Sequence, residues 1–397
     1  MAMIQCRFFN GYKPCSKNEV CDQSCPQQDL LTQNILIVHL GAIGAVVRST
    51  SLLKAIHEKY PKARLHWVTE KPSNELLRNH PRIDRIWTNQ FSDIVQLKNF
   101  VFAAAFVIDK DLRATGVVKE LKINQVFGFT ADPISGAILP ANVEARELWQ
   151  IGLSNHIKFN VNQKSEARLL HESLQLGVYQ RPEYDLPLTA DESVESLQRK
   201  RLWSQQGHQL IIGLNTGCSA VLAQKKFAVS VWVEVIQAIW QSDVIALQEA
   251  EIVLLGGKED ESRNAEIASQ FSTHDLIASP TQGGLRDGLI SVASCDLIIS
   301  GDSLGLHMAI SQKIPVVAWF GPTCAHEIEF YDRAVVVRSE HACSPCWNRD
   351  CRVANKCNEE VDIAKIVQGC HHLLTQFFPN RLHTENLIQS DPKLSYL

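Results

Sequence analysis

The 397-residue sequence lacks an apolar run long enough to cross a bilayer, and it lacks a hydrophobic segment of the secretory type. Its longest apolar stretches, such as Phe100–Ile108, fall well short of the roughly 20 residues that a membrane-spanning helix needs. Met1–Phe9 includes Arg7 but no apolar core, so we expect no secretory signal. We therefore expect a cytosolic protein whose only membrane contact is peripheral.

A concentrated charge of one sign is also missing. The chain has 39 Lys and Arg against 43 Asp and Glu, which leaves a net charge of −4 without long charged runs. Binding to nucleic acid needs a concentrated basic face, so we do not expect nucleic acid as a partner. Hydrophobic residues make up 45% of the chain, which favours packed cores over disorder. At roughly 100–200 residues per domain, the length predicts two domains.

The amino-acid composition of the chain changes near residue 34. Residues 1–33 are polar and cysteine-rich, which indicates a small appendage without a core of its own. From residue 34 on, short apolar strands alternate with helices, the pattern of a parallel sheet. The expected strands are Ile35–Leu40, Leu65–Val68, Arg85–Trp87, Ala104–Ile108, Leu210–Leu214, Ile252–Leu255, Leu297–Ser300 and Val316–Phe320.

The pattern restarts near Gln209, which gives an α/β protein of two doubly wound units. We expect a cysteine-rich extension at 1–33, a first domain at 34–190, a second at 205–378 and a tail at 379–397. Ligands of such units bind at the carboxyl ends of the strands, here in a cleft that the two domains face.

Glycine and small polar residues follow each predicted strand of the second half. The four strand ends are Asn215-Thr216-Gly217, Gly256-Gly257, Gly301-Asp302-Ser303 and Gly321-Pro322-Thr323. Such ends let the backbone approach a ligand closely. This half is therefore the expected ligand-binding half.

The third of these strand ends leads directly into a predicted helix, Leu304–Ser311. Asp302 or Ser303 is placed to cap it, and the free N–H groups of its first turn, which includes Gly305, suit a diphosphate. His307 lies one turn in, within reach of a phosphate or ribose oxygen. A capped helix with a core histidine is the alternative.

Two charged stretches follow the first two strand ends of this half. Lys225 and its neighbour Lys226 suit a phosphate, although an ordinary solvated pair explains them as well. The acids Glu259, Asp260 and Glu261 either favour the start of the next helix or include an acceptor for a ribose hydroxyl.

The chain resembles glycosyltransferase family 9, the ADP-heptose:lipopolysaccharide heptosyltransferases, from about residue 34 to 375. The stretches that carry the resemblance are Leu40–Leu53, Gly213–Phe227, Val253–Glu261, Asp296–Ala309 and Trp319–Thr323. The resemblance implies a GT-B fold of two Rossmann-like domains and inverting sugar transfer without a catalytic metal. By the same resemblance the donor is ADP-heptose, and the acceptor is a lipopolysaccharide or another cell-envelope glycan.

Carried over residue by residue, Lys225 matches the phosphate-contacting lysine of a K-x-[WF]-P stretch, although Ala228 replaces its proline. Asp302, Ser303 and His307 match the family's D-[TS]…H donor segment, and an acid at 259–261 matches a ribose contact. The residues expected at the donor are Thr216, Lys225, Glu259, Glu261, Asp302, Ser303, Gly305 and His307. Gly44 and Arg48 are expected at the acceptor.

One departure from the family concerns the general base. The family's loop reads G-D-V-x-x-[TS], whereas this chain has Ala45 in place of that aspartate. Asp109 or Asp111 is a candidate replacement, although either could be a helix cap or a surface acid. The alternatives are a catalytically weak or inactive sugar-nucleotide-binding or assembly protein, or an epimerase of the same architecture.

Eight of the twelve cysteines form two groups of four, and cytosolic thiols in such groups favour metal over disulfides. One group is Cys343, Cys346, Cys351 and Cys357, and a similar pattern recurs in family 9. The other, Cys6, Cys15, Cys21 and Cys25, resembles the start of a subgroup that reads C-[RH]-x-F-x-G-x-x-P-C. We expect structural zinc; an iron–sulfur cluster and one site pooled from both groups remain open. Cys218, Cys295, Cys324 and Cys370 are expected to be isolated.

Overall fold

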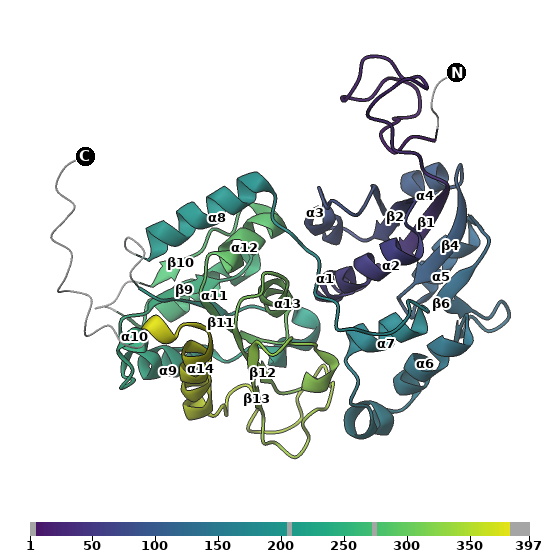
Figure 1. Cartoon of the computed structure of the whole chain (residues 1–397). Coiled ribbons are helices and arrows are strands. Elements are labelled where there is room, and N and C mark those ends of the chain that lie inside the picture. Colours follow the sequence, from purple (N-terminus) through teal and green to yellow (C-terminus); the bar gives the residue numbers. More distant parts are fainter. Residues whose placement is uncertain (1–4, 205–208, 272–275, 382–397) are drawn as a thin grey trace, which may run out of the picture. The chain divides into compact units, whose positions relative to one another are not determined.

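The computed structural model describes residues 5–204, 209–271 and 276–381 (Figure 1). The expected tail from residue 382 on, residues 1–4 of the extension and residues 205–208 therefore lie outside the described part. The contacts divide the chain into two units. The first is Met1–Pro187 with His326–Glu329, and the second is Leu188–Ala325 with Phe330–Leu397.

The first unit is built on a seven-stranded sheet in the order β3-β2-β1-β4-β6-β7, with β5 paired to β4. Every described pair is parallel except β7 on β6. The strands are β1 (Gln33–Val38), β2 (Ala63–Thr69), β3 (Arg85–Thr88), β4 (Val101–Val107), β5 (Lys122–Ile123), β6 (Val126–Ala131) and β7 (Ile138–Pro140). The helices are α1 (Ile43–Ser49), α2 (Leu53–Lys59), α3 (Ser73–Leu77), α4 (Phe91–Leu97), α5 (Leu112–Lys119), α6 (Arg146–Leu153) and α7 (Glu166–Ser173).

The second unit has a six-stranded parallel sheet in the order β10-β9-β8-β11-β12-β13. This is the doubly wound order 3-2-1-4-5-6 of dinucleotide-binding folds. The strands are β8 (Ile211–Asn215), β9 (Glu251–Leu255), β10 (Ile277–Ala278), β11 (Leu297–Gly301), β12 (Val316–Phe320) and β13 (Ala334–Arg338). The helices are α8 (Ala190–Trp203), α9 (Val229–Trp240), α10 (Ile245–Gln248), α11 (Glu261–Ala268), α12 (Gly284–Ala293), α13 (Leu304–Ser311) and α14 (Ile363–Phe377).

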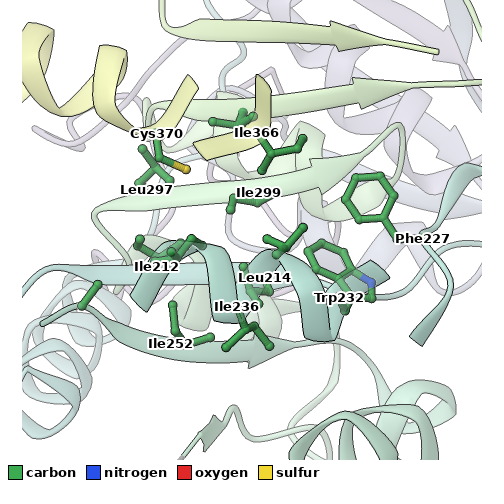
Figure 2. Packing of buried hydrophobic residues seen from close by; sticks show 14 of the residues in the cluster. Ile212, Leu214, Phe227, Trp232, Ile236, Ile252, Leu297, Ile299, Ile366 and Cys370 are labelled. Atoms are coloured by element: carbon green, nitrogen blue, oxygen red, sulfur yellow. The ribbon is translucent and has the colours of Figure 1, made fainter. Parts of the chain in front are cut away.

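One face of the second sheet packs against α9 and α14 (Figure 2). Ile212 and Ile299 extend from β8 and β11 towards Trp232 and Ile236 of α9, and all four side chains are fully buried. The Trp232 ring lies 4.7 Å from the ring of Phe227, which directly precedes α9. Burying one such side chain contributes about 1.5–3 kcal/mol. The core therefore holds the chain next to Lys225 in place.

Each strand expected from the sequence is present, with ends within about three residues. The edge strands β7, β10 and β13, together with β5, β6 and α14, were not anticipated. Edge strands are half covered, as the mostly intermediate burial of β7 and β13 shows, so they carry no continuous buried apolar run. The stretch between the expected first domain, which ends at 190, and the second, which begins at 205, forms the 14-residue helix α8, which a capping box at Thr189 and Glu192 starts.

No helix in the described ranges is both long and apolar enough to cross a membrane.

Candidate functional site

The central strands of the second sheet, β8 and β11, are neighbours whose connections leave on opposite sides. At such a switch point the loops diverge, and ligands of doubly wound folds bind there. The chain after β8 is Thr216-Gly217, and β11 ends at Gly301, next to Asp302. Two of the four strand ends singled out from the sequence, those of β8 and β11, therefore lie at this switch point.

Lys225, Asp302 and His307 form one charged group beyond β11. Lys225 Nζ lies 2.9 Å from Asp302 Oδ2, and His307 Nε2 lies 3.9 Å from Asp302 Oδ1. Burial alone would raise the pKa of the Asp302 carboxyl, but Lys225 and His307 outweigh it and hold that pKa below its usual value. Asp302 is thus an ionised carboxylate that orients two groups able to contact phosphate.

Gly301 allows a second, backbone contact to the same lysine. A Cβ atom at position 301 would lie 1.9 Å from the carbonyl oxygen of Lys225, so only glycine fits. The short 3-10 segment Ala220–Lys225 thereby packs directly on the end of β11. Two contacts therefore fix Lys225: its carbonyl oxygen packs against Gly301, and its ammonium group forms an ion pair with Asp302.

Asn215, which the sequence analysis did not assign to the site, links the two central strands. Its Nδ2 donates to Ser300 Oγ at 2.8 Å and to Ser303 Oγ at 2.5 Å. A Cβ on Gly305 would clash with the same amide, at 2.5 Å from its Cγ. An asparagine that ends a buried strand was the available signal, because a buried amide must find hydrogen-bond partners.

The expected side-chain cap of α13 is absent. Ser303 holds the N-cap position, but its side chain makes no capping hydrogen bond, and Asp302 is engaged with Lys225. Ser303 Oγ instead accepts from Asn215, because that buried amide is close by. The first-turn N–H groups of α13 are therefore left without a side-chain acceptor from the cap, as an anion site requires.

Of the three acids after β9, the middle one turns inward. Asp260 is buried, accepts a hydrogen bond from the Gly257 N–H at 3.0 Å, and fills the space next to Gly217 and Gly256. Burial raises the pKa of its carboxyl. Glu259 and Glu261, the expected ribose contacts, are exposed, and Glu261 accepts from Thr281 and Gln282.

Thr216, another expected donor contact, has a fully buried side chain. Its hydroxyl bonds Asn264 Oδ1 at 2.5 Å and lies 3.2 Å from the Leu255 carbonyl oxygen. Thr216 thus connects the end of β8 to α11 and to the end of β9 by hydrogen bonds. Its buried side chain stabilises the loop that follows β8.

The loop that carries Cys343, Cys346, Cys351 and Cys357 is bonded to the loops of this site. The N–H groups of Cys346 and Trp347 both donate to the Pro322 carbonyl, at 3.1 and 2.9 Å. On the other side, Asn358 Nδ2 donates to the Lys226 carbonyl at 3.0 Å, and the Ala228 N–H donates to the Asn358 carbonyl at 2.9 Å. The cysteine loop therefore supports the chain on both sides of the Lys225–Asp302 pair.

All twelve cysteines are free thiols. Burial raises the pKa of the Cys357 thiol to about 11, with a further contribution from the three other cysteines of its group. Cys6, Cys15, Cys21 and Cys25 line one small cavity of the first unit. In the part of the chain that the structure describes, no three His, Cys, Asp or Glu side chains form a ready-made metal site.

The switch point of the first sheet lies between β1 and β4, and a carboxylate of the protein itself occupies it. Asp109, just after β4, accepts hydrogen bonds from the N–H groups of Leu40 and Gly41, the latter at 3.0 Å. His39 Nε2 is 3.8 Å from the same carboxylate. The carboxylate thus binds the backbone of the loop that leads to Gly44.

A hydrogen bond to Ser49 fixes the tautomer of His39. Ser49 Oγ donates to the Val46 carbonyl at 2.9 Å, so it accepts from His39 Nδ1 at 2.7 Å. The Nε2 atom then carries the lone pair and faces Asp109. Burial lowers the pKa of His39 despite the nearby carboxylate.

The other residues expected around the acceptor serve mainly structural contacts. Asp111 caps α5 by accepting from the Ala114 N–H at 2.9 Å. Arg48 is buried and forms an ion pair with Glu166. Gly44 and Ala45 are partly exposed in the first turn of α1.

These features define the class: two doubly wound α/β units, one of which has a helix without a side-chain cap next to a lysine at its switch point. Among solved structures, the chain is similar to the ADP-heptose lipopolysaccharide heptosyltransferase II of E. coli. The TM-score is 0.62 at 17% identity, over 86% of this chain and 99% of that one. This likeness shows an α/β fold with parallel sheets of the kind that GT-B glycosyltransferases have.

The model of glycosyltransferase family 9 (heptosyltransferase) matches residues 153–357. That is 205 of 397 residues, more than half, so the chain belongs to this family of glycosyltransferases. The chain is also 26% identical over 170 residues to lipooligosaccharide heptosyltransferase 2 of Campylobacter jejuni, an alignment that spans 41% of this chain and about half (51%) of that relative. It is 22% identical to lipopolysaccharide heptosyltransferase 1 of Campylobacter coli, over 75% of this chain and 86% of the relative.

Replacing Gly301 by alanine tests the contact between β11 and Lys225. Because the new methyl meets a backbone oxygen, we expect a loss of about 1–3 kcal/mol in the free energy of unfolding, measured by denaturant titration. The matched control is Gly288→Ala in α12, where nothing lies within 4 Å of the added atom. That variant should be as stable as the parent or slightly more so, because alanine favours helix. Equal stability of both variants would contradict the close approach at Gly301.

Proposed function

We propose that this chain transfers heptose from ADP-heptose, with inversion, to the core of a lipopolysaccharide or a related cell-envelope glycan. The observation that carries the proposal is the group of Lys225, Asp302 and His307 at the start of α13. Membership of family 9 and the similarity to lipopolysaccharide heptosyltransferases support the sugar and the acceptor class. A lipid-linked acceptor would place the reaction at the cytosolic face of the membrane.

The donor diphosphate would lie against the first turn of α13, where uncapped N–H groups and the helix dipole favour negative charge. Lys225 would supply a mobile positive charge, and His307 a further hydrogen bond. Asp302 is a positioning residue here, because it holds both groups in place. These groups would stabilise the leaving diphosphate without a catalytic metal.

The transfer itself would be a single displacement. The acceptor hydroxyl oxygen forms a bond to the anomeric carbon of the heptose while the bond from that carbon to the diphosphate breaks. ADP leaves with the electron pair of that bond, and the hydroxyl proton passes to a base. Attack from the face opposite the leaving group inverts the anomeric centre.

The first experiment measures ADP-heptose binding by calorimetry and ADP release with a heptose-deficient lipopolysaccharide as acceptor. Replacing Lys225 by methionine should weaken donor binding by about 10- to 100-fold, because a charge-assisted hydrogen bond contributes about 1.5–3 kcal/mol. Lys98→Met is the control, since Lys98 pairs with Glu120 on the surface. Unchanged affinity in Lys225→Met would rule out this donor site.

We assign the role of general base to Asp109 rather than Asp111. Asp111 is committed to the N-cap of α5, whereas Asp109 binds the loop of Leu40 and Gly41, which leads to the acceptor residues expected in α1. His39 Nε2 lies 3.8 Å from the same carboxylate. Asp109 would in this way replace the base that Ala45 cannot provide.

Asp109→Asn should lower kcat by about 10²- to 10⁴-fold, as loss of a positioned base does, while ADP-heptose affinity stays unchanged. Asp111→Asn is the matched control, because asparagine caps a helix about as well as aspartate. If both variants lose activity equally, or if Ala45→Asp restores a much higher rate, Asp109 is not the base.

A second function, donor binding without transfer, is favoured by one observation, Ala45 at the usual base position. In that case the protein is a sugar-nucleotide-binding or assembly protein. Binding of ADP-heptose without transfer or hydrolysis for any acceptor would support it. Interconversion of a free nucleotide sugar without acceptor would instead indicate an epimerase.

We further propose that Cys343, Cys346, Cys351 and Cys357 hold a structural metal ion. Four thiols at short spacing suit a tetrahedral ion, and each would bind as a thiolate. The hydrogen bonds from this loop to Pro322 and Lys226 couple it to the donor residues. A bound ion would keep the cysteine loop, and with it the hydrogen bonds to Pro322 and Lys226, in one conformation.

Replacing Cys346 and Cys351 together by serine should remove one equivalent of metal per chain in elemental analysis. It should also weaken ADP binding several-fold, because the N–H groups of Cys346 and Trp347 would no longer be held against the Pro322 carbonyl. Cys370→Ala, which removes a core thiol of α14, should keep the metal content. Full metal content in the double variant would exclude this site.

A further inference from the structure

The described residues 5–32 of the cysteine-rich extension have almost no core. They contain no helix or strand apart from an isolated bridge between Cys6 and Leu30. Tyr12 and Val20, large enough to form a core, are 91% and 59% exposed. A segment of this size with so little burial needs a cross-link to keep one conformation.

The four cysteines of this segment converge on one cavity. Cys6, Cys15, Cys21 and Cys25 line it together with Phe8, Phe9 and Val20. The four thiols come from well-separated points of the segment, and none is oxidised to a disulfide. The cavity is therefore the only place in the described segment where a cross-link could join all of its turns.

Hydrogen-bond donors already point at two of the sulfur atoms. The Asp29 N–H donates to Cys6 Sγ and the Asn18 side-chain amide donates to Cys25 Sγ, each at 3.4 Å. Metal-bound thiolates commonly accept such bonds, which spread their negative charge. Lys17 of the same segment lies 3.9 Å above the Phe8 ring.

We propose that Cys6, Cys15, Cys21 and Cys25 bind one thiophilic metal ion of the Zn²⁺ class, separate from any ion at the second cysteine group. The thiols line the cavity without forming a finished coordination sphere, so binding draws them together and releases their protons. Four thiols that line one cavity match the tetrahedral four-cysteine ligand set of Zn²⁺.

The ion would also fix how the extension attaches to the first sheet. Arg7, next to Cys6, pairs with Asp29 at 2.7 Å and with Asp84 at 2.5 Å. Arg64 of β2 donates to the Cys6 carbonyl at 3.0 Å. A metal at Cys6 would therefore lock a turn that bonds the extension to the start of β2 and to Asp84, just before β3.

The test uses the full-length chain and does not depend on sugar transfer. The metal-free protein is titrated with Co²⁺, whose d–d and thiolate-to-metal absorption bands report tetrahedral thiolate ligands. We compare the parent with Cys15→Ser/Cys21→Ser and, to isolate the extension, with Cys346→Ser/Cys351→Ser. The first double variant should bind one equivalent less than the parent, whereas the second should still show the bands of the extension.

A second readout covers the case in which the variant fails to fold. Chelation of the metal in the parent should expose residues 5–32 to proteolysis, and Zn²⁺ should restore protection, while residues 34–187, the rest of the first unit, stay intact. Equal Co²⁺ binding by the parent and Cys15→Ser/Cys21→Ser, acid-labile sulfide in the purified protein, or protease sensitivity that ignores Zn²⁺ would each overturn the proposal. Calorimetry with ADP on the same variant should show unchanged affinity, which separates this site from the donor site.

Discussion

The second unit depends on the close approach of Gly301 to the carbonyl oxygen of Lys225. Because no side chain intervenes, the segment before α9 lies directly on the end of β11. The ammonium group of Lys225 then reaches Asp302, and the chain that follows enters the core through Phe227 and Trp232. Because Gly301 has no side chain, the segment that carries Lys225 can contact both the hydrophobic core and the charged group at the start of α13.

The two units repeat one topology but use its switch point differently. In the second, Asn215 joins the central strands and leaves the α13 N–H groups without a side-chain cap, next to Lys225. In the first, Asp109 already fills the equivalent position by accepting from Leu40 and Gly41. A nucleotide diphosphate would meet a carboxylate in the first unit and N–H groups in the second, which is why the donor site is proposed in the second unit.

Much of the fold could be read from the sequence because the central strands are buried on both faces. The runs in β8, β9, β11 and β12 are mainly apolar, and each ends at a glycine or is followed by one within two residues. The edge strands β7, β10 and β13 could not be predicted in this way, since much of their surface is exposed. The grouping of Lys225 with Asp302 follows from neighbouring strand ends. The inward turn of Asp260 does not, because three adjacent acids differ only in which one the backbone directs towards Gly217.

The bonds between the cysteine loop and Pro322 also set an order of events during synthesis. Domains fold as the chain emerges, N-terminal part first. The carbonyl of Pro322 finds its two donors only when Cys346 and Trp347 have left the ribosome, and the carbonyl of Lys226 waits for Asn358. Helix α14, which closes the core over β12 and β13, comes later still. The nascent chain therefore cannot complete the loops around Lys225 and Asp302 until nearly all of the second unit has been made. A truncated product ending before residue 358 would carry Lys225, Asp302 and His307 without the support that holds their loops.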